Sequence, residues 1–347
     1  MADFIPSVLL AAQAKITPRF NEAELRERQN PILRVGLANQ DYLVQNVAAI
    51  KESPKRSVKG YQFKRMSADN GTARSHNFTG NQGDSIEVDL NWGVYTENLG
   101  IYMNVGLDNV MSYAEILANQ ISQKQRIIRE RLGAALVASL HAGRTGVANA
   151  TVRNAEFNAT TDAFEIAAAD KDQFFAYVRS VMNQHKYYGN IDLMVDSVLD
   201  PVARKIAAQG AGNATNLQYS LQGISNIMAH DTLGTDVAVA GYANGGVAIA
   251  LPANSFAFIP WIPINYRNGF GDAMSDIGIY ATMPDDTGLP LTYSLRGYAE
   301  RADGSSNGGT VDDIKINWQL GIDVATQIAD ISVADETPIY EFALLQS

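Results

Sequence analysis

The side chains that could perform acid–base or metal chemistry are few and scattered. The four histidines are His76, His141, His185 and His230, and none of them belongs to an H-E-x-x-H or H-x-H pattern. Such patterns bring two imidazoles together, as a zinc ion requires. We therefore expect surface or helix-end histidines, no metal ligands and no cofactor.

The acidic pairs and glycine-rich segments also lack the setting of a reactive site. Asp285-Asp286 and Asp312-Asp313 lie in predicted turns, where we expect solvated loops, with loose divalent-cation binding as the alternative. Gly304 to Gly309 lacks the strand–helix context of a phosphate site. The chain contains no P-loop and no G-x-G-x-x-G motif. Residues 304–308 match G-x-S-x-G by letter, but they lie at a predicted hairpin tip and not in the strand–turn–helix elbow that this motif requires. The sequence therefore predicts no enzyme.

Basic side chains gather in two places. Lys124, Arg126, Arg129 and Arg131 share the polar face of a predicted helix, where we expect solvent contact and keep nucleic-acid contact as the alternative. The second group lies in a polar segment over 54–83, in which Asp69-Asn70-Gly71 predicts a hairpin turn. A polar two-stranded ribbon is marginal alone, so we expect it to rest on another subunit. The candidate contact residues are Lys55, Arg56, Lys59, Tyr61, Phe63, Lys64, Arg65 and Arg74.

Composition limits the classes to which the protein can belong. The chain has 347 residues, 46% of them hydrophobic, and a net charge of −10. This content supports a core, and the acidic balance argues against a protein that coats nucleic acid. There is no cysteine, hence no disulfide or thiolate metal site. The N-terminus does not resemble a signal peptide, and no apolar run reaches the ~18 residues of a membrane span.

A long helix over Ser112 to Ala142 organises the chain. Ser112 and Glu115 form an S-x-x-E capping box, and Gly143 supplies the stop. At 1.5 Å per residue the helix would be roughly 45 Å long, which suits a flat or elongated protein. One face carries an apolar stripe of Ala114, Leu117, Ile121, Ile128, Leu132, Ala135 and Leu140.

Strict alternation predicts strands on both sides of this helix. Apolar residues alternate with polar ones over 86–92, over 289–295 and over 314–324. The last of these would be a strand of roughly 36 Å, long enough to lie along the helix. The two long strands are expected to form one sheet against it.

The remaining segments predict an N-terminal arm and a small α/β unit. Prolines interrupt every helical run before residue 55, so this arm should lie along another surface, with a plain N-terminal helix pair of a globular domain as the alternative. The expected unit comprises a helix capped by Asp170 and Gln173, a strand over 191–195 and a helix from Asp200-Pro201 to Gly210. Strands are also expected at 224–228, 237–240 and 247–251, and aromatic residues 256–261 should form the edge of the unit.

This order of elements resembles the Hong Kong 97-type fold of tailed-bacteriophage major capsid proteins, with residues 88–136 as the most telling stretch. The resemblance rests on architecture, because the family has no short diagnostic motif. It implies an α+β fold: an N-terminal arm over 1–54, an extended loop over 55–85, a peripheral domain over 86–189 with spine helix 112–142, an axial domain over 190–262, and a return over 263–347 with long strand 311–325.

The resemblance also implies a function. Copies of the chain would assemble into pentamers and hexamers of an icosahedral head around packaged double-stranded DNA, in the virion, after assembly in the host cytoplasm. The implied partners are a separate scaffolding protein, a portal and decoration proteins, with no membrane. Some relatives crosslink through a lysine of the extended loop, but we expect none here for Lys55, Lys59 or Lys64. The alternatives are an encapsulin-type compartment and an α/β enzyme with an unrecognised site.

Overall fold

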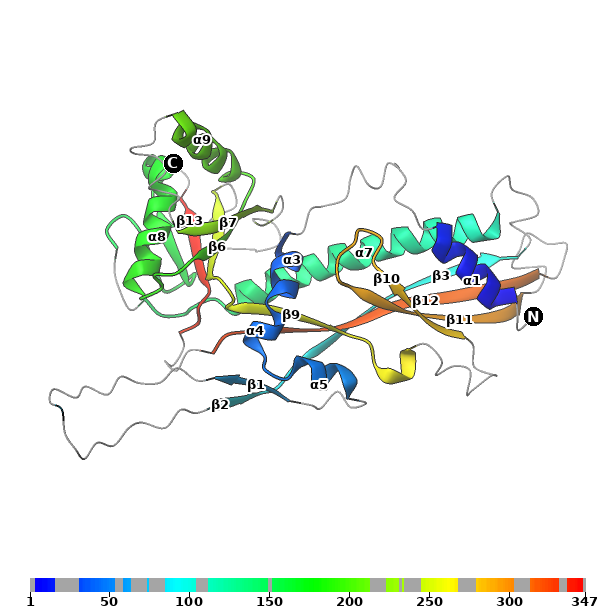
Figure 1. The fold of residues 1–347 in the computed structure, drawn as a ribbon. Coiled ribbons are helices and arrows are strands. Elements are labelled where there is room, and N and C mark those ends of the chain that lie inside the picture. Colours follow the sequence, from blue (N-terminus) through cyan, green and yellow to red (C-terminus); the bar gives the residue numbers. More distant parts are fainter. Residues whose placement is uncertain are drawn as a thin grey trace.

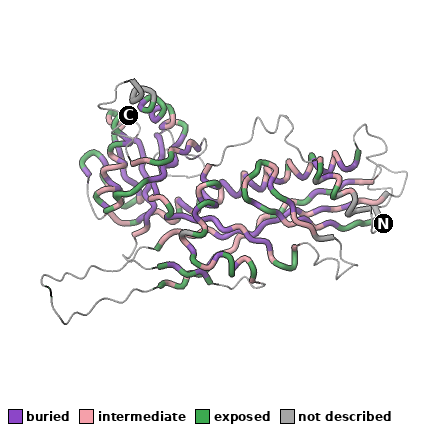
Figure 2. Tube along the Cα trace, in the orientation of Figure 1, coloured by how far each residue is buried: buried purple, intermediate pink, exposed green. Residues whose placement is uncertain are grey.

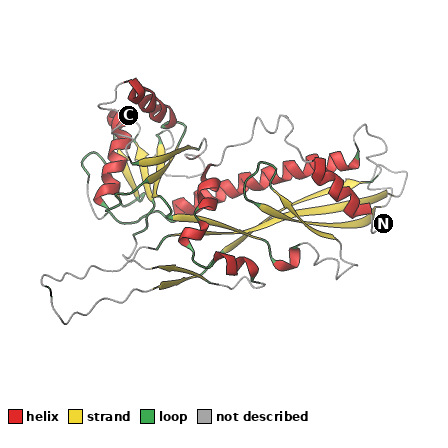
Figure 3. Cartoon of the chain, viewed as in Figure 1, coloured by secondary structure: helices red, strands yellow, loops and turns green. Residues whose placement is uncertain are grey.

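The computed structural model describes residues 4–15, 31–53, 59–63, 74, 85–103, 112–148, 152–212, 223–230, 233, 245–267, 279–302, 313–330 and 336–345. Figure 1 shows an elongated molecule in which a long helix lies along a long sheet. A second unit of sheet and helices sits at one end, and a thin hairpin lies beside the sheet. The fold is a mixed helix-and-sheet, or α+β, architecture, as predicted (Figure 3).

The long helix α7 spans Tyr113–Ala142, 30 residues, and begins at the predicted cap. The Ser112 hydroxyl accepts the backbone N–H of Glu115, and the Glu115 carboxylate accepts the backbone N–H of Ser112 at 2.9 Å. The hydrogen bond from that N–H has the largest effect on the pKa of Glu115, and the Lys15 ammonium, 3.1 Å away, has the next largest. Together they lower this pKa to about 2. The capping box is therefore confirmed, and it also ties the N-terminal helix to α7.

Replacing Ser112 by alanine should lower the free energy of unfolding by ~1 kcal/mol, because a helix-end N–H loses its acceptor. Urea unfolding followed by circular dichroism measures the change. Ser112→Thr keeps a hydroxyl at this position and is the matched control. Equal destabilisation by both variants would contradict a capping role.

The long sheet is antiparallel, and the predicted strand over 314–324 lies in its interior, but its partner is the segment over 92–102 and not the predicted strand over 86–92. Its order is β10-β11-β12-β3, and β9 pairs with β12 beyond the end of β11. Trp318 of β12 lies opposite Leu99 of β3 and Gly297 of β11. The strands are β3 Trp92–Tyr102, β9 Phe256–Trp261, β10 Ile279–Pro284, β11 Thr292–Ala302 and β12 Asp313–Ile328.

The core between α7 and this sheet follows the predicted stripe and alternation. Ile121 and Ile128 of α7 and Leu320 of β12 have no exposed surface (Figure 2). Trp318 fills the space above Gly297, where a Cβ atom would lie 2.6 Å from the indole ring. A glycine is needed at that point because the tryptophan occupies the place of a side chain.

The predicted strand over 86–92 is divided between two strands in the structure. β2, Ser85–Val88, pairs with β1, Gly60–Phe63, whereas β3 begins at Trp92. Leu90 lies between them and is buried against Val44 and Ile50. Leu90 is not in a strand, but it is buried because it packs on the arm. The alternation of apolar and polar residues therefore continues through the bend, and the pattern alone did not reveal the break.

The arm lies along the body of its own subunit. α1 runs against α7, and α3 crosses β9, where Gly36 lies close to Phe258. Val44 and Ile50 pack on the opposite face of the sheet, against Ile259. The two faces of the sheet are thus both covered near β9. The arm helices are α1 Phe4–Lys15, α3 Pro31–Ala38, α4 Gln40–Leu43 and α5 Val47–Glu52.

A six-stranded mixed sheet forms the core of the second unit, in the order β4-β5-β13-β8-β6-β7. Helix α8, Phe174–Gln184, buries Phe174 and Val178 against aromatic residues such as Phe342, and α9, Asp200–Gly212, adds Ile206 to the same cluster. The strands are β4 Glu156–Asn158, β5 Ala163–Ile166, β6 Ile191–Val195, β7 Ile224–Ala229, β8 Val247–Pro252 and β13 Tyr340–Leu344.

The sheets do not divide where we placed the domain boundaries. β4, β5 and α8 precede residue 190 yet belong to the unit of the six-stranded sheet. β9, expected as the edge of that unit, pairs instead with β12, which extends to Ile328. β13, which we did not predict, returns the C-terminal segment to the second unit. Short buried strands have no exposed face, so their composition does not indicate which sheet they join.

Several smaller expectations differ from the structure. Asp170 lies inside the 3-10 helix η1, Ala168–Gln173, and α8 begins at Phe174 without a side-chain cap. Helix α9 continues beyond Gly210 to Gly212. The expected strand at 237–240 and the loop 303–309 lie outside the described residues. Within the described part of the chain, no helix combines the length and apolar character needed to cross a membrane.

A buried carboxylate joins the end of α7 to the second sheet. Glu341 of β13 has no exposed surface, and its Oε2 lies 2.7 Å from His141 Nδ1 and 3.9 Å from Arg144 Nε. Burial raises the pKa of Glu341, although the interaction with His141 acts in the opposite direction. The histidine at the helix end thus has a structural partner.

The Glu341→Gln variant should lose part of the pH dependence of stability. Because the folded-state pKa of Glu341 is raised, the native protein binds more protons than the unfolded chain above about pH 4.5, and stability falls as pH rises through the folded pKa. The variant should lack this fall, measured as the free energy of unfolding at several pH values from about 4.5 to 7. Parallel profiles for the two proteins would contradict the assignment.

Candidate assembly surfaces

The β1–β2 hairpin is attached to the rest of the chain, among the described residues, through Tyr61 O and the buried side chain of Gln62. Backbone N–H groups of Gln45 and Asp330 donate to Tyr61 O and to Gln62 Oε1, at 3.1 and 3.2 Å. The Gln62 side chain donates to Ile328 O at 3.5 Å, and Gln62 is buried. These contacts fix the hairpin beside the end of β12 (Figure 1).

The opposite face of the hairpin presents aromatic side chains to solvent. Tyr61 is 45% exposed and Phe63 is 75% exposed. They lie two residues apart on one strand, so they project from the same side of the ribbon. Their cross-strand partners, Glu87 and Ser85, are short or polar. An exposed apolar pair on a fixed ribbon is a candidate surface for contact with another molecule.

The structure places only part of the predicted basic contact set. Lys59 lies 3.0 Å from Glu87 and 3.7 Å from Asp89, and the hydrogen bond to Glu87 raises the pKa of Lys59. Its charge is therefore balanced within the hairpin. Arg74 is exposed. The other four predicted residues, Lys55, Arg56, Lys64 and Arg65, lie outside the described residues.

The face of the long sheet away from α7 is a second candidate surface, which the sequence analysis did not single out. Arg296, Gln319 and Asn98 form one row across three strands, and Tyr298 and Asn317 lie in the next row. Tyr298 is 47% exposed, and the Gln319 amide donates to Asn98 at 3.0 Å. The signal was present in the polar members of the predicted alternation. This half of the sheet thus carries a polar, open face.

The basic face of α7 is not the solvated face that we predicted. Arg129 is buried and its guanidinium lies 2.7 Å from Asp285 Oδ1, with Asp286 also paired. Asp285, expected in a solvated loop, is buried as well. The Tyr293 hydroxyl donates to Asp285 Oδ1 at 2.9 Å. The loop after β10 is therefore pinned to α7 by a buried ion pair.

Two further cations of α7 pair with one carboxylate of β3. Lys124 and Arg131 lie 3.1 and 2.8 Å from Glu97. Although burial acts to raise the pKa of Glu97, these two cations hold it below its usual value. The side chains that could have formed a nucleic-acid surface on this helix thus neutralise acids of their own chain.

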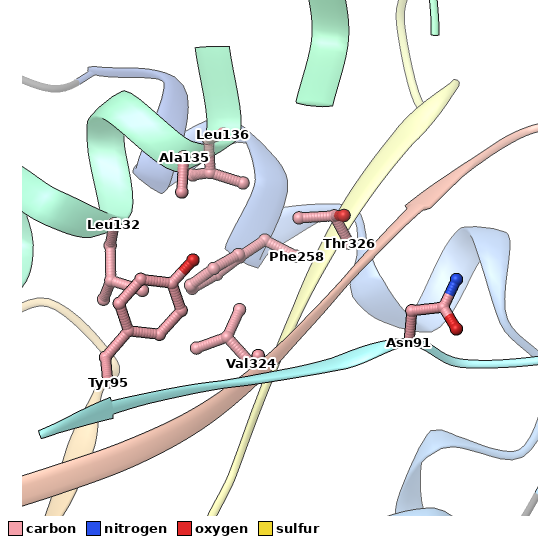
Figure 4. A pocket seen from close by; sticks show the side chains of 9 residues that line it. Asn91, Tyr95, Leu132, Ala135, Leu136, Phe258, Val324 and Thr326 are labelled. Carbon is pink, nitrogen blue, oxygen red and sulfur yellow. The ribbon is translucent and has the colours of Figure 1, made fainter. Parts of the chain in front are cut away.

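The cavity between α7 and the long sheet does not offer catalytic groups. It measures about 190 Å³, and Tyr95 is its only titratable lining residue, beside apolar side chains such as Leu132 and Phe258 (Figure 4). His185 lies at the C-terminal end of α8, so it is a helix-end histidine as expected, although it is buried and burial lowers its pKa. His230 is also buried. No group of three or more His, Asp or Glu side chains in the described segments is placed to hold a metal ion.

Comparison with known proteins finds similarity in structure alone. No protein-family model and no curated protein matches the chain. A structure from Mycobacterium phage Che8 is 9% identical, with a TM-score of 0.44 over 86% of this chain and 88% of the other. The capsid of Myoviridae phage XM1 is 9% identical, with a TM-score of 0.42 over 94% and 99%. A mature capsid structure of bacteriophage PhiM1 is 12% identical, with a TM-score of 0.39 over 84% and 82%.

Proposed function

We propose that this chain is a structural protein, the major capsid protein of a tailed bacteriophage with a Hong Kong 97-type fold. The observation that supports it most is the β1–β2 hairpin, which is held to its own subunit by Gln62 and leaves Tyr61 and Phe63 exposed on the other face. In this proposal, the hairpin buries the apolar area of these two side chains only against a neighbouring subunit. The long helix along a long sheet gives the elongated, plate-like subunit that a thin shell needs (Figure 1).

In this proposal, each part of the chain has a role in the shell. The segment around β1 and β2 is the extended loop, α7 is the spine helix, and the six-stranded unit is the axial domain that meets its copies at five- and six-fold centres. The arm helices brace the subunit. Modest interfaces, repeated around closed rings, sum to a stable particle, so stability depends on subunit concentration.

The proposed shell is an icosahedral head built of pentamers and hexamers around double-stranded DNA. A separate scaffolding protein, a portal and decoration proteins are the expected partners, with assembly in the host cytoplasm. The net charge of −10 accords with a container that does not hold its DNA tightly. Genome-length DNA in purified particles would support this assignment, whereas a protein cargo would indicate the encapsulin-type alternative.

The Phe63→Asp variant should fold normally but assemble poorly. Phe63 is largely exposed in the subunit, so a charge there has little effect on its stability. In the assembled shell the same charge would be desolvated in an apolar contact. Sedimentation should show a shift from particles to free subunits or small oligomers. Phe63→Leu preserves apolar area and should assemble; normal particles from Phe63→Asp would contradict the role of the hairpin.

A further inference from the structure

A small pocket opens on the side of the long sheet away from α7. It measures about 280 Å³ and lies where the end of α5, the end of β9, the 3-10 helix η2, Ile264–Tyr266, and the β10–β11 hairpin meet (Figure 1). Its walls are largely apolar. The lining residues are Lys51, Pro260, Trp261, Ile262, Arg267, Thr282, Pro290 and Thr292.

Two cations line this pocket without an ion-pair partner among the described residues. The Arg267 guanidinium donates to Ile262 O at 3.0 Å and to Lys51 O. The Lys51 ammonium donates to Gln40 Oε1 at 2.7 Å. Neither cation lies within 4.0 Å of a carboxylate oxygen in those segments, whereas both acceptors of Arg267 are neutral carbonyls.

The environment makes these charges costly as they stand. Burial lowers the pKa of Lys51, against the opposing effect of the Asp41 carboxylate. Lys51 is also held in place, because the indole N–H of Trp261 donates to its carbonyl at 3.3 Å. The Asp41 carboxylate acts on Lys51 from beyond ion-pair distance, so the described residues leave the positive charge of the pocket only partly compensated. A bound anion would offset the cost of desolvation.

We propose that this pocket receives an acidic side chain, aspartate or glutamate, from a second copy of the chain. The inference rests on the proposed function, since it presumes that copies associate. The pocket, at about 280 Å³, has ample room for one acidic side chain. Pro260, Trp261 and Pro290 would contact its apolar stem while Lys51 and Arg267 bind the carboxylate. A duplex phosphate lies on a broad convex backbone and has no apolar stem to match these walls. With 37 acidic residues, each copy offers many candidate side chains.

Zero-length carbodiimide crosslinking of assembled protein tests the proposal. The reagent converts a carboxylate to an O-acylisourea; the Lys51 amine then attacks the acyl carbon, forming an amide and releasing the reagent as its urea. Assemblies are made from a mixture of ¹⁴N- and ¹⁵N-labelled chains, so that mass spectrometry separates links between chains from links within one chain. We expect Lys51 in links of mixed isotope composition. Lys205, which lies 3.4 Å from Asp172 of its own chain, is the internal control and should give links of one isotope only.

Substitutions of Lys51 give an independent readout. Lys51→Met should abolish the crosslink and raise the critical concentration of assembly about fivefold, the change that corresponds to one ion pair. Lys51→Arg keeps the charge, so assembly should persist although the amine is absent. Circular dichroism and urea unfolding verify that each variant is folded.

The outcomes separate this inference from the proposed function. Shells that form with Lys51 linked only within its own chain, or unlinked, would overturn the pocket's role and leave the shell assignment intact. If duplex DNA protects Lys51 from chemical acetylation whereas assembly does not, the ligand of the pocket is a phosphate and not a carboxylate. That result would also overturn the inference. A chain that never associates would overturn both.

Discussion

Replacing Ile128 by aspartate is expected to prevent folding. Ile128 lies in the middle of α7 with no exposed surface, facing the long sheet. Loss of a buried isoleucine side chain alone costs about 2–5 kcal/mol, and desolvation of the carboxylate adds to this. Since domains are typically stable by about 5–15 kcal/mol, the native state should not survive. The expected observation is insoluble or protease-sensitive protein with no cooperative unfolding transition.

Two controls isolate the cause. Ile128→Val should cost only ~0.5–1.5 kcal/mol, because it removes a single methyl group. Gln123→Asp places the same carboxylate on an exposed position of the same helix and should change stability by less than ~0.5 kcal/mol. A soluble, native-like Ile128→Asp protein would contradict the orientation of α7.

Arg129→Met should lower the free energy of unfolding by about 3–5 kcal/mol. The side chains of Arg129 and Asp285 are 5% and 0% exposed, so removing the guanidinium leaves two carboxylates, Asp285 and Asp286, without their cation. Methionine retains much of the volume, which confines the effect to charge and hydrogen bonding. Urea unfolding followed by fluorescence measures the loss.

Arg126→Met is the matched control for this variant. Arg126 lies on the same helix and pairs with Glu130, but both side chains are partly exposed. An exposed pair of this spacing contributes ~0.3–0.5 kcal/mol. Similar losses for the two variants would show that the Arg129 ion pair is not stabilising the loop after β10.

The parts of the fold that could be predicted are those with long, regular patterns. The S-x-x-E box at Ser112 and the apolar stripe determined the bounds of α7 to within one residue. The alternation over 314–324 predicted β12 and its buried face. In such segments each residue repeats the same signal, so a local exception does not obscure it.

Short or buried segments could not be placed in the same way. β9 and β13 are both buried. β9 pairs with β12, and β13 pairs with β5 and β8, so each pairing depends on residues far away in the chain. Charge was misleading for a related reason. Arg129 sits among polar residues of α7, and only the three-dimensional position of Asp285 makes it a buried residue.

The candidate surfaces were predicted in part. Tyr61 and Phe63, both singled out from the sequence, are exposed on the hairpin, and their contact with a neighbour stays a prediction. Lys51 and Arg267, which line one pocket, are more than two hundred positions apart in the chain. The other walls of this pocket belong to strands whose pairing we did not predict. Neither residue belongs to a motif, so the sequence held no signal for it.

The most direct test of the shell assignment is negative-stain electron microscopy of the purified chain, paired with light scattering across a range of protein concentrations and salt. The proposal predicts hollow shells, or discrete pentamers and hexamers, whose fraction rises with concentration. A monomer or dimer under every condition, with no larger species after addition of a crowding agent, would contradict self-assembly of the chain by itself and favour the α/β-enzyme alternative.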